Sequence, residues 1–223
     1  MPVFGATLAD QPAMTAVLAD LALESEAATV TAMRLARAHD EDADDQEKAF
    51  RRLATAVAKY WICKRGPHHA YEALECLGGN GYTEAFPLAM RYREQPVMAV
   101  WEGSGNVIAL DVLRAMTREP ESVAAFDAEI SKAQGANRTL DLHLERLRNQ
   151  LGELARMDAS AAQRHARSVV ESMALALQAS LVVRFSPAPV SDAFVAARLG
   201  ADRAFEYGAL AGDADLGAIL ARQ

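Results

Sequence analysis

Cysteine is scarce in this chain of 223 residues, which holds two, Cys63 and Cys76. Two cysteines at these positions are too few for a disulfide scaffold or a zinc site, so we expect reduced thiols on helices and no metal site. The start of the sequence has no basic region followed by an apolar run, which argues against a signal peptide. Because no run of about eighteen consecutive apolar residues occurs, the sequence also predicts no membrane span. Together these absences indicate a cytoplasmic protein.

Positive charge is also limited, with 23 lysines and arginines against 30 aspartates and glutamates and a net charge of −7. Phosphate binding needs a net or clustered positive surface, so this balance disfavours nucleic acid as a partner. Residues 117–223 are nearly balanced, with 12 basic and 14 acidic residues. A helical bundle that gathers its arginines on one face would still present a basic patch, so the charge leaves this partner open.

Strand patterns of period two are almost absent, and alanine, leucine, arginine and glutamate dominate the composition. Both observations favour an all-α fold. We expect Gly66-Pro67 to kink or interrupt one long helix and a break near residues 208–213 to divide the last one. Apolar residues at helical spacing predict a helix over residues 12–37 and a second that follows the polar loop 39–46 and runs to Gly66. Further helices are predicted over residues 68–77, 104–116, 121–134, 138–156, 159–184 and 190–221.

These helices divide into two groups. The predicted all-α fold has two helical layers joined near residue 117, where Pro120 punctuates the chain. The sequence therefore predicts one helical domain at residues 1–116 and a second helical unit at residues 117–223.

Between residues 78 and 100 the helical pattern lapses, and we expect an ordered, irregular loop. Long loops inside helical domains usually carry function. The run Gly78-Gly79-Asn80-Gly81-Tyr82 has two interpretations. Closely spaced glycines let backbone amides approach a phosphate or a ring, but a glycine after Leu77 also suits the end of a helix followed by a turn. Spacing alone favours the helix end.

Charged residues follow this loop. Arg91-Tyr92-Arg93-Glu94 is most simply an ion-paired cluster. Glu102 comes directly after the apolar run 97–101 and just before Gly103-Ser104-Gly105-Asn106. An acid after such a run is expected to be partly desolvated, which suits a general base. Glu102 could equally flank or cap the helix that follows, and the spacing does not decide between these roles.

Three segments, in this order, resemble the acyl-CoA dehydrogenase family: YEALECLGGNGYTE over residues 71–84, Arg91-Tyr92-Arg93-Glu94, and Trp101-Glu102-Gly103-Ser104-Gly105-Asn106. Residues 57–61 and 63–67, together with the tryptophan before the acid, resemble the branch associated with the adaptive response to DNA alkylation (AidB-like). The resemblance implies the carboxyl-terminal helical bundle of the family over residues 1–116 and an additional helical subdomain over residues 117–223.

The resemblance also implies an FAD-dependent oxidation of an acyl-CoA to a trans-2-enoyl-CoA. Glu102 stands at the position of the base that removes the pro-R α-proton while the β-hydride passes to N5 of FAD. Its backbone amide would help to polarise the thioester carbonyl. Ser104 and Asn106 match positions that contact the adenine-diphosphate half of FAD. A loop that packs on FAD, commonly the FAD of a neighbouring subunit, is matched by Gly78, Gly79 and Gly81.

Some features depart from the family pattern. Glu75 stands where many relatives carry a glutamine near the adenine. Phe4-Gly5 matches a Phe-Gly that follows an FAD-binding arginine in relatives, but Met1 takes the position of that arginine. The amino-terminal helices and middle β-domain of the family have no counterpart in these 223 residues. We therefore expect a homo-oligomer (dimer or tetramer) or a separately encoded amino-terminal half as partner, besides the acyl-CoA substrate.

Three functions fit these observations. The first is the carboxyl-terminal part of an FAD-dependent acyl-CoA dehydrogenase, with Glu102 as its base. The second is a helical oligomerisation module without turnover of its own. The third is an alkylation-response flavoprotein that protects DNA, which the charge balance disfavours.

Overall fold

The structure is a computed structural model that describes residues 2–3, 5–201, 203 and 205–223. A short antiparallel hairpin, in which β1 (Pro2–Val3) pairs with β2 (Ala6–Thr7), precedes the helices. The all-α prediction is confirmed. The helices of the described chain are η1 (Leu8–Asp10), α1 (Pro12–Arg37), α2 (Asp45–Cys76), α3 (Gly79–Tyr82), α4 (Leu88–Met98), α5 (Gly105–Arg118), α6 (Pro120–Ser131), α7 (Arg138–Leu154), α8 (Ala159–Phe185), α9 (Ala188–Leu199) and α10 (Leu216–Leu220).

The two long amino-terminal helices begin at residues suited to helix starts. α1 begins at Pro12, where the missing N–H and the fixed φ of proline do no harm. α2 follows Asp44, whose carboxylate accepts a hydrogen bond of 2.8 Å from the amide of Glu47. Such a cap satisfies one of the free N–H groups in the first turn of a helix. The predicted polar loop before α2 is therefore confirmed, and it ends in the capping residue Asp44.

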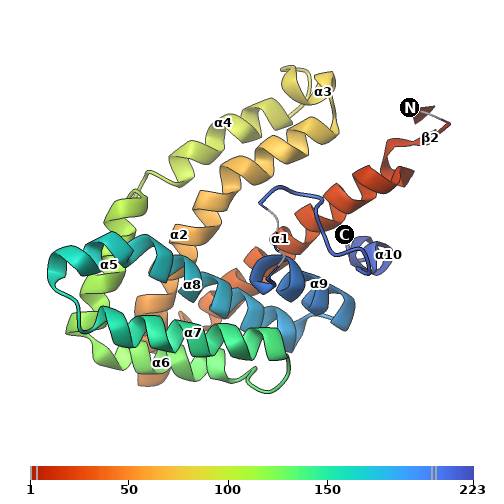
Figure 1. The fold of residues 1–223 in the computed structure, drawn as a ribbon. Coiled ribbons are helices and arrows are strands. Elements are labelled where there is room, and N and C mark those ends of the chain that lie inside the picture. Colours follow the sequence, from red (N-terminus) through yellow and green to blue (C-terminus); the bar gives the residue numbers. More distant parts are fainter. Residues whose placement is uncertain (1, 4, 202, 204) are drawn as a thin grey trace.

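α2 continues through Pro67 without a break, so an interruption at Gly66-Pro67 is wrong. Proline removes one intrahelical hydrogen bond, but α4 packs along this part of α2 and supports it (Figure 1). Gly66 lies in this contact, against the flexible side chain of Gln95. A β-carbon at Gly66 would lie 2.4 Å from Oε1 of Gln95 in α4.

The predicted irregular loop over residues 78–100 is also wrong for most of its length, since α3 and α4 occupy it. Pro87 directly precedes α4, where its missing N–H costs nothing. α4 runs back beside α2, and α3 joins the two at the far end of the pair (Figure 1). Ala89 is the one residue of α4 that is buried. A helix that buries so little of its surface has no broad apolar stripe, which explains why the helical pattern is not visible in the sequence.

The helices α5, α6, α7 and α9 pack around α8 (Figure 1). Every residue of α8 from Met173 to Val182 is buried. Among the described residues, α8 is the one helix long and apolar enough to cross a membrane, but 67% of its apolar window is buried inside the protein. A helix at the centre of a bundle is apolar on all sides, which accounts for this composition.

The last predicted helix is interrupted earlier than expected, because α9 ends at Leu199 and α10 begins at Leu216, and the residues described between them form no helix. This segment is attached to the long helices. Tyr207 is buried, with its ring centroid 5.8 Å from that of His69 in α2. The amide of Gly208 donates to Oδ2 of Asp20 in α1 at 3.0 Å.

A single hydrophobic cluster joins the chain before and after residue 117. It contains Leu23 of α1 and Leu53 of α2 as well as Leu144 of α7 and Leu177 of α8. An ion pair of 2.9 Å between Arg34 and Glu129 joins the same parts. The division into domains at residues 1–116 and 117–223 stays a prediction.

Candidate active site

Glu102 lies in a tight turn between α4 and α5. Amide N–H groups of Trp101 and Gly103 close this turn by donating to the carbonyls of Val97 and Val100, at 2.9 and 3.3 Å. Glu102 has a φ of 59°, and it is the one non-glycine residue with a positive φ in the described part of the chain. A left-handed conformation costs an L-residue about 1–2 kcal/mol. The surrounding structure must therefore hold Glu102 in this conformation.

Lys59 of α2 provides part of that support. Its Nζ donates to the carbonyl oxygen of Trp101 at 2.9 Å and to that of Gly103 at 3.0 Å. Hydrogen bonds from a charged donor are stronger than neutral ones, so this pair offsets backbone strain at Glu102. The sequence assigns no role to Lys59, since 42 residues separate it from Trp101.

The Glu102 side chain is exposed, so residues of this chain do not supply the expected partial desolvation. Glu102 borders a groove of about 510 Å³ between α2 and α5. Whatever covers this groove would also remove water from the carboxylate. The other lining residues are Arg52, Thr55, Ala56, Lys59, Val107, Ile108, Leu110, Asp111 and Arg114.

Ser104 and Asn106 both lie at the beginning of α5. Ser104 occupies the position before the helix, but its hydroxyl makes no capping bond. The Asn106 side-chain oxygen accepts a hydrogen bond of 2.8 Å from Nε of Arg167 in α8. Ser104 is therefore free to contact a ligand, whereas Asn106 also fixes α5 to α8.

The glycine segment ends α2 and begins α3. Gly78 has a φ of 57°, and its amide donates to the carbonyl of Glu75 at 2.8 Å. This geometry agrees with the helix-end interpretation. Gly78 and Gly79 are exposed, and a β-carbon at either would meet no atom within 4 Å. The surface at these two glycines is therefore open to a further group.

Gly81 is different, because a β-carbon there would lie 2.1 Å from the carbonyl oxygen of Leu74. We expect Gly81→Ala to destabilise the protein by about 1–3 kcal/mol, since backbone must move to relieve the clash. Gly79→Ala is the matched control and should change stability by less than about 0.5 kcal/mol. Urea unfolding of both variants measures the difference. Equal stabilities would show that α2 and α3 do not approach each other as closely as described.

The structure brings Glu102, Ser104 and Asn106 together but leaves the glycine segment apart from them. Gly78, Gly79 and Gly81 lie at the α3 end of α4, and the Glu102 turn lies at its other end (Figure 1). One chain therefore does not combine these residues into a single site.

Arg91-Tyr92-Arg93-Glu94 lies on α4 as an ion-paired cluster, as predicted. Nη1 of Arg91 lies 3.1 Å from Glu94, and Nη1 of Arg93 lies 2.7 Å from Glu84. All four charged side chains are exposed. Exposed pairs of this kind contribute little to stability.

Comparison with known proteins places this site in a family. The family model described as "Acyl-CoA dehydrogenase, C-terminal domain" matches residues 1–117, which include the Glu102 turn and the glycine segment. The chain belongs to the acyl-CoA dehydrogenase family. This confirms the resemblance carried by the three motifs.

Two relatives show how much of an acyl-CoA dehydrogenase the chain represents. AidB of Escherichia coli (strain K12) is 44% identical over 149 residues, which are 67% of this chain and 28% of AidB. Acyl-CoA dehydrogenase family member 11 of Caenorhabditis elegans is 30% identical over 148 residues, 65% of this chain and 24% of that protein. The chain thus spans about a quarter of the length of these relatives.

A solved acyl-CoA dehydrogenase has a similar fold over most of the chain. The crystal structure of C. elegans ACDH-11 in complex with C11-CoA superposes with a TM-score of 0.79 at 25% identity. The superposed region covers 91% of this chain and 38% of the ACDH-11 chain. Phe4, which carries part of the sequence resemblance, lies outside the described residues.

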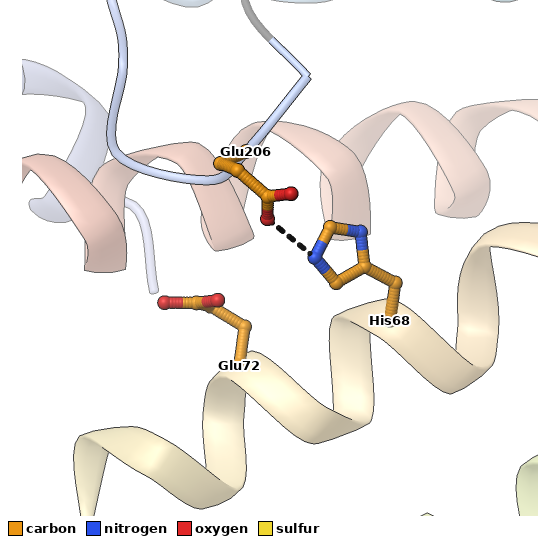
Figure 2. Close-up of side chains that lie close together, drawn as sticks. All are labelled: His68, Glu72 and Glu206. Atoms are coloured by element: carbon orange, nitrogen blue, oxygen red, sulfur yellow. Dashed lines mark hydrogen bonds and ion pairs between the residues drawn. The ribbon is translucent and has the colours of Figure 1, made fainter.

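Sequence reasoning missed one further group of side chains. His68 and Glu72 lie on α2, and Glu206 from the segment after α9 lies against them (Figure 2). One potential ligand atom from each lies within 4.8 Å of the others. Imidazole and carboxylate groups bind divalent cations, but the 2.9 Å contact between His68 Nε2 and Glu206 Oε2 also attaches the segment to α2 without one. The absence of a metal site stays a prediction.

Proposed function

We propose that the chain is the carboxyl-terminal part of an FAD-dependent acyl-CoA dehydrogenase in which Glu102 removes the α-proton of an acyl-CoA. The observation that carries this proposal is the Glu102 turn. Its carboxylate is exposed beside a groove, and its backbone is held in a left-handed conformation within the part that matches the family model. The C11-CoA bound to C. elegans ACDH-11 supports an acyl-CoA as the substrate.

In this reaction the chain must accept a proton and stabilise the negative charge that develops on the thioester oxygen. The Glu102 carboxylate accepts the proton. Within the described chain the Glu102 amide N–H donates to no acceptor, so it is available to the thioester oxygen. A preorganised donor of this kind stabilises charge as it develops. Bound FAD supplies the chemistry that accepts the β-hydride.

The residues present fit FAD at two separate places. Near the Glu102 turn, Ser104 has a free hydroxyl and Asn106 a side-chain nitrogen without a partner in the described chain. At the other end of α4, the glycine segment (Gly78, Gly79 and Gly81) exposes backbone with open space at its first two positions. We infer that one chain offers Ser104 and Asn106 to one flavin and its glycine segment to the flavin of a neighbouring subunit.

Exposed apolar side chains on and near α4 support such a partner. Large exposed side chains of the α2 end, α3, α4 and the turn after α4 are Tyr71, Leu77, Tyr82, Phe86, Met90, Tyr92, Val97, Met98, Val100 and Trp101. Large apolar patches on a protein surface mark contacts with other proteins. The partner is a further copy of the chain, in a dimer or tetramer, or a separately encoded amino-terminal half. We propose a cytoplasmic location for the assembly.

The chain prepared alone is expected to retain much less than one FAD per chain, whether or not it associates with itself, because it spans about a quarter of the length of its relatives and matches the C-terminal domain of the family. Gel filtration with added FAD, followed by absorbance in the flavin bands, measures this. Coexpression with a polypeptide that carries the amino-terminal helices and β-domain of the family should restore stoichiometric flavin and acyl-CoA oxidation.

Three outcomes would change this account. A stoichiometrically yellow chain by itself would contradict the expected dependence on the amino-terminal part of the family. A flavin-loaded assembly that does not oxidise acyl-CoA would contradict the proposed function. An assembly that forms but stays colourless would favour the oligomerisation module instead.

A further inference from the structure

We propose that Lys59 is a positioning residue, whose ammonium group holds the carbonyls on both sides of Glu102 and thereby aims the Glu102 N–H at the carbonyl oxygen of an acyl thioester. The catalytic part of this inference rests on the proposed function. Its structural part does not.

The two hydrogen bonds of Lys59 reach the peptide unit that joins Trp101 to Glu102 and the one that joins Gly103 to Ser104. Nζ lies 2.9 Å from the Trp101 oxygen and 3.0 Å from the Gly103 oxygen. Neither carbonyl belongs to the last turn of α4, which ends at Met98. Lys59 is therefore not simply a cap for the carboxyl end of that helix. Its half-buried side chain lines the same groove as Glu102.

Peptide geometry links the Trp101 carbonyl to the Glu102 amide, because the two belong to one peptide unit. The C=O and N–H of a trans peptide point in opposite directions. When Lys59 holds the Trp101 oxygen, the Glu102 N–H must point away from the ammonium. That N–H has no acceptor within the described chain. A cation on the carbonyl also polarises the peptide unit and strengthens its N–H as a donor.

The second hydrogen bond restrains the backbone just beyond Glu102, because it holds the Gly103 carbonyl. Glu102 and Gly103 have φ angles of 59° and 130°. Residues other than glycine and asparagine rarely adopt such angles without support. By holding the Trp101–Glu102 and Gly103–Ser104 peptide units, Lys59 fixes the chain on both sides of the peptide between Glu102 and Gly103, and so restrains the base and the oxyanion donor together.

The structural part is tested on the 223-residue chain alone by NMR of Lys59→Met, Lys59→Arg and the control Lys48→Met. Lys48 lies on the same helix, where it makes an exposed pair with Asp45. In Lys59→Met, coupling constants and carbon shifts of residue 102 should report loss of the left-handed φ, whereas Lys59→Arg and Lys48→Met should keep it. An unchanged φ in Lys59→Met would overturn the proposal, whatever the activity.

The catalytic part is tested on the flavin-loaded assembly. Lys59→Met should lower kcat by about 10- to 100-fold with little change in KM or flavin content, somewhat less than the loss of an oxyanion donor itself. Lys59→Arg should recover most of the activity, and Lys48→Met should match the wild type. A kcat within about twofold of wild type for Lys59→Met, or a loss confined to KM, would overturn this part. A wild-type assembly that is inactive after full flavin loading overturns the proposed function, and the NMR result still decides whether Lys59 sets the turn.

Discussion

Glu102→Gln is expected to lower the rate of acyl-CoA oxidation by a factor of roughly 10² to 10⁴, the usual contribution of a general base. Glutamine has the same shape as glutamate, but its neutral amide does not accept the α-proton. The Glu102 side chain is exposed in the described chain, so the substitution should change folding stability by less than about 0.5 kcal/mol. Flavin content should also stay the same, since Ser104 and Asn106 are untouched. Steady-state oxidation of an acyl-CoA by the flavin-loaded assembly measures the effect.

A matched control separates the chemistry from the loss of one negative charge. Glu145 is exposed on α7 and takes no part in the Glu102 turn. Glu145→Gln should leave the rate within about twofold of wild type, as expected for a surface change away from the site. If both variants lost activity to the same extent, a general effect of charge or assembly would explain the result better than a base at Glu102.

The second large effect is expected at Glu129 of α6, which is 2% exposed and pairs with Arg34, Lys132 and Arg184 at 2.9, 2.6 and 2.7 Å. Glu129→Gln leaves the guanidinium groups of Arg34 and Arg184 without their shared carboxylate. Removing one partner of a buried ion pair costs about 3 kcal/mol. For a protein of this size, thermal unfolding should show a Tm lower by roughly 6–12 °C.

Asp127→Asn is the control for this prediction, because Asp127 lies on the same helix and pairs with Arg148 at 2.9 Å. The side chains of Asp127 and Arg148 are both well exposed, at 45% and 38%. An exposed pair contributes less than about 1 kcal/mol. A Tm change for Asp127→Asn as large as that for Glu129→Gln would contradict the role of burial.

The Glu129 effect should also depend on pH. Burial raises the pKa of this carboxyl, but hydrogen bonds from Arg34, Lys132 and Arg184 outweigh it and lower the pKa from 4.5 to about 2. A carboxyl with a lowered pKa stabilises the folded state above its unfolded pKa, and this contribution is lost as the pH falls through the folded value. The stability difference between wild type and Glu129→Gln should therefore be full at neutral pH and shrink between about pH 5 and pH 2. A constant difference over this range would argue against the ion pairs as its source.

The fold class and most helices follow from sequence patterns because they depend on local periodicity. Apolar residues at helical spacing, among them the buried Phe50, Leu53 and Val57, predict α2 with few assumptions. α4 escapes prediction, since its contact with α2 leaves most of its side chains exposed. α2 continues through Pro67 in a part of the fold where α4 packs against it. Tertiary packing decides both cases, and it has no signature within a short window of sequence.

The site is predictable in part for the same reason. Glu102 and its small neighbours are consecutive, so they form a recognisable motif. Lys59 and Glu206 act across long separations, and their partners become visible only once α2 lies beside the turn after α4 and the segment after α9. The exposure of Glu102 is likewise invisible in sequence, because an apolar run predicts burial while here Val100 and Trp101 remain exposed themselves.

The central claim is that Glu102 removes the α-proton, and a single-turnover experiment tests it most directly. The flavin-loaded assembly is mixed with an acyl-CoA in the absence of oxygen, and the absorbance of the oxidised flavin is followed in wild type and Glu102→Gln. Wild type should bleach rapidly, and Glu102→Gln should bind the acyl-CoA and stay yellow over the same period. Bleaching of Glu102→Gln at the wild-type rate would contradict the claim.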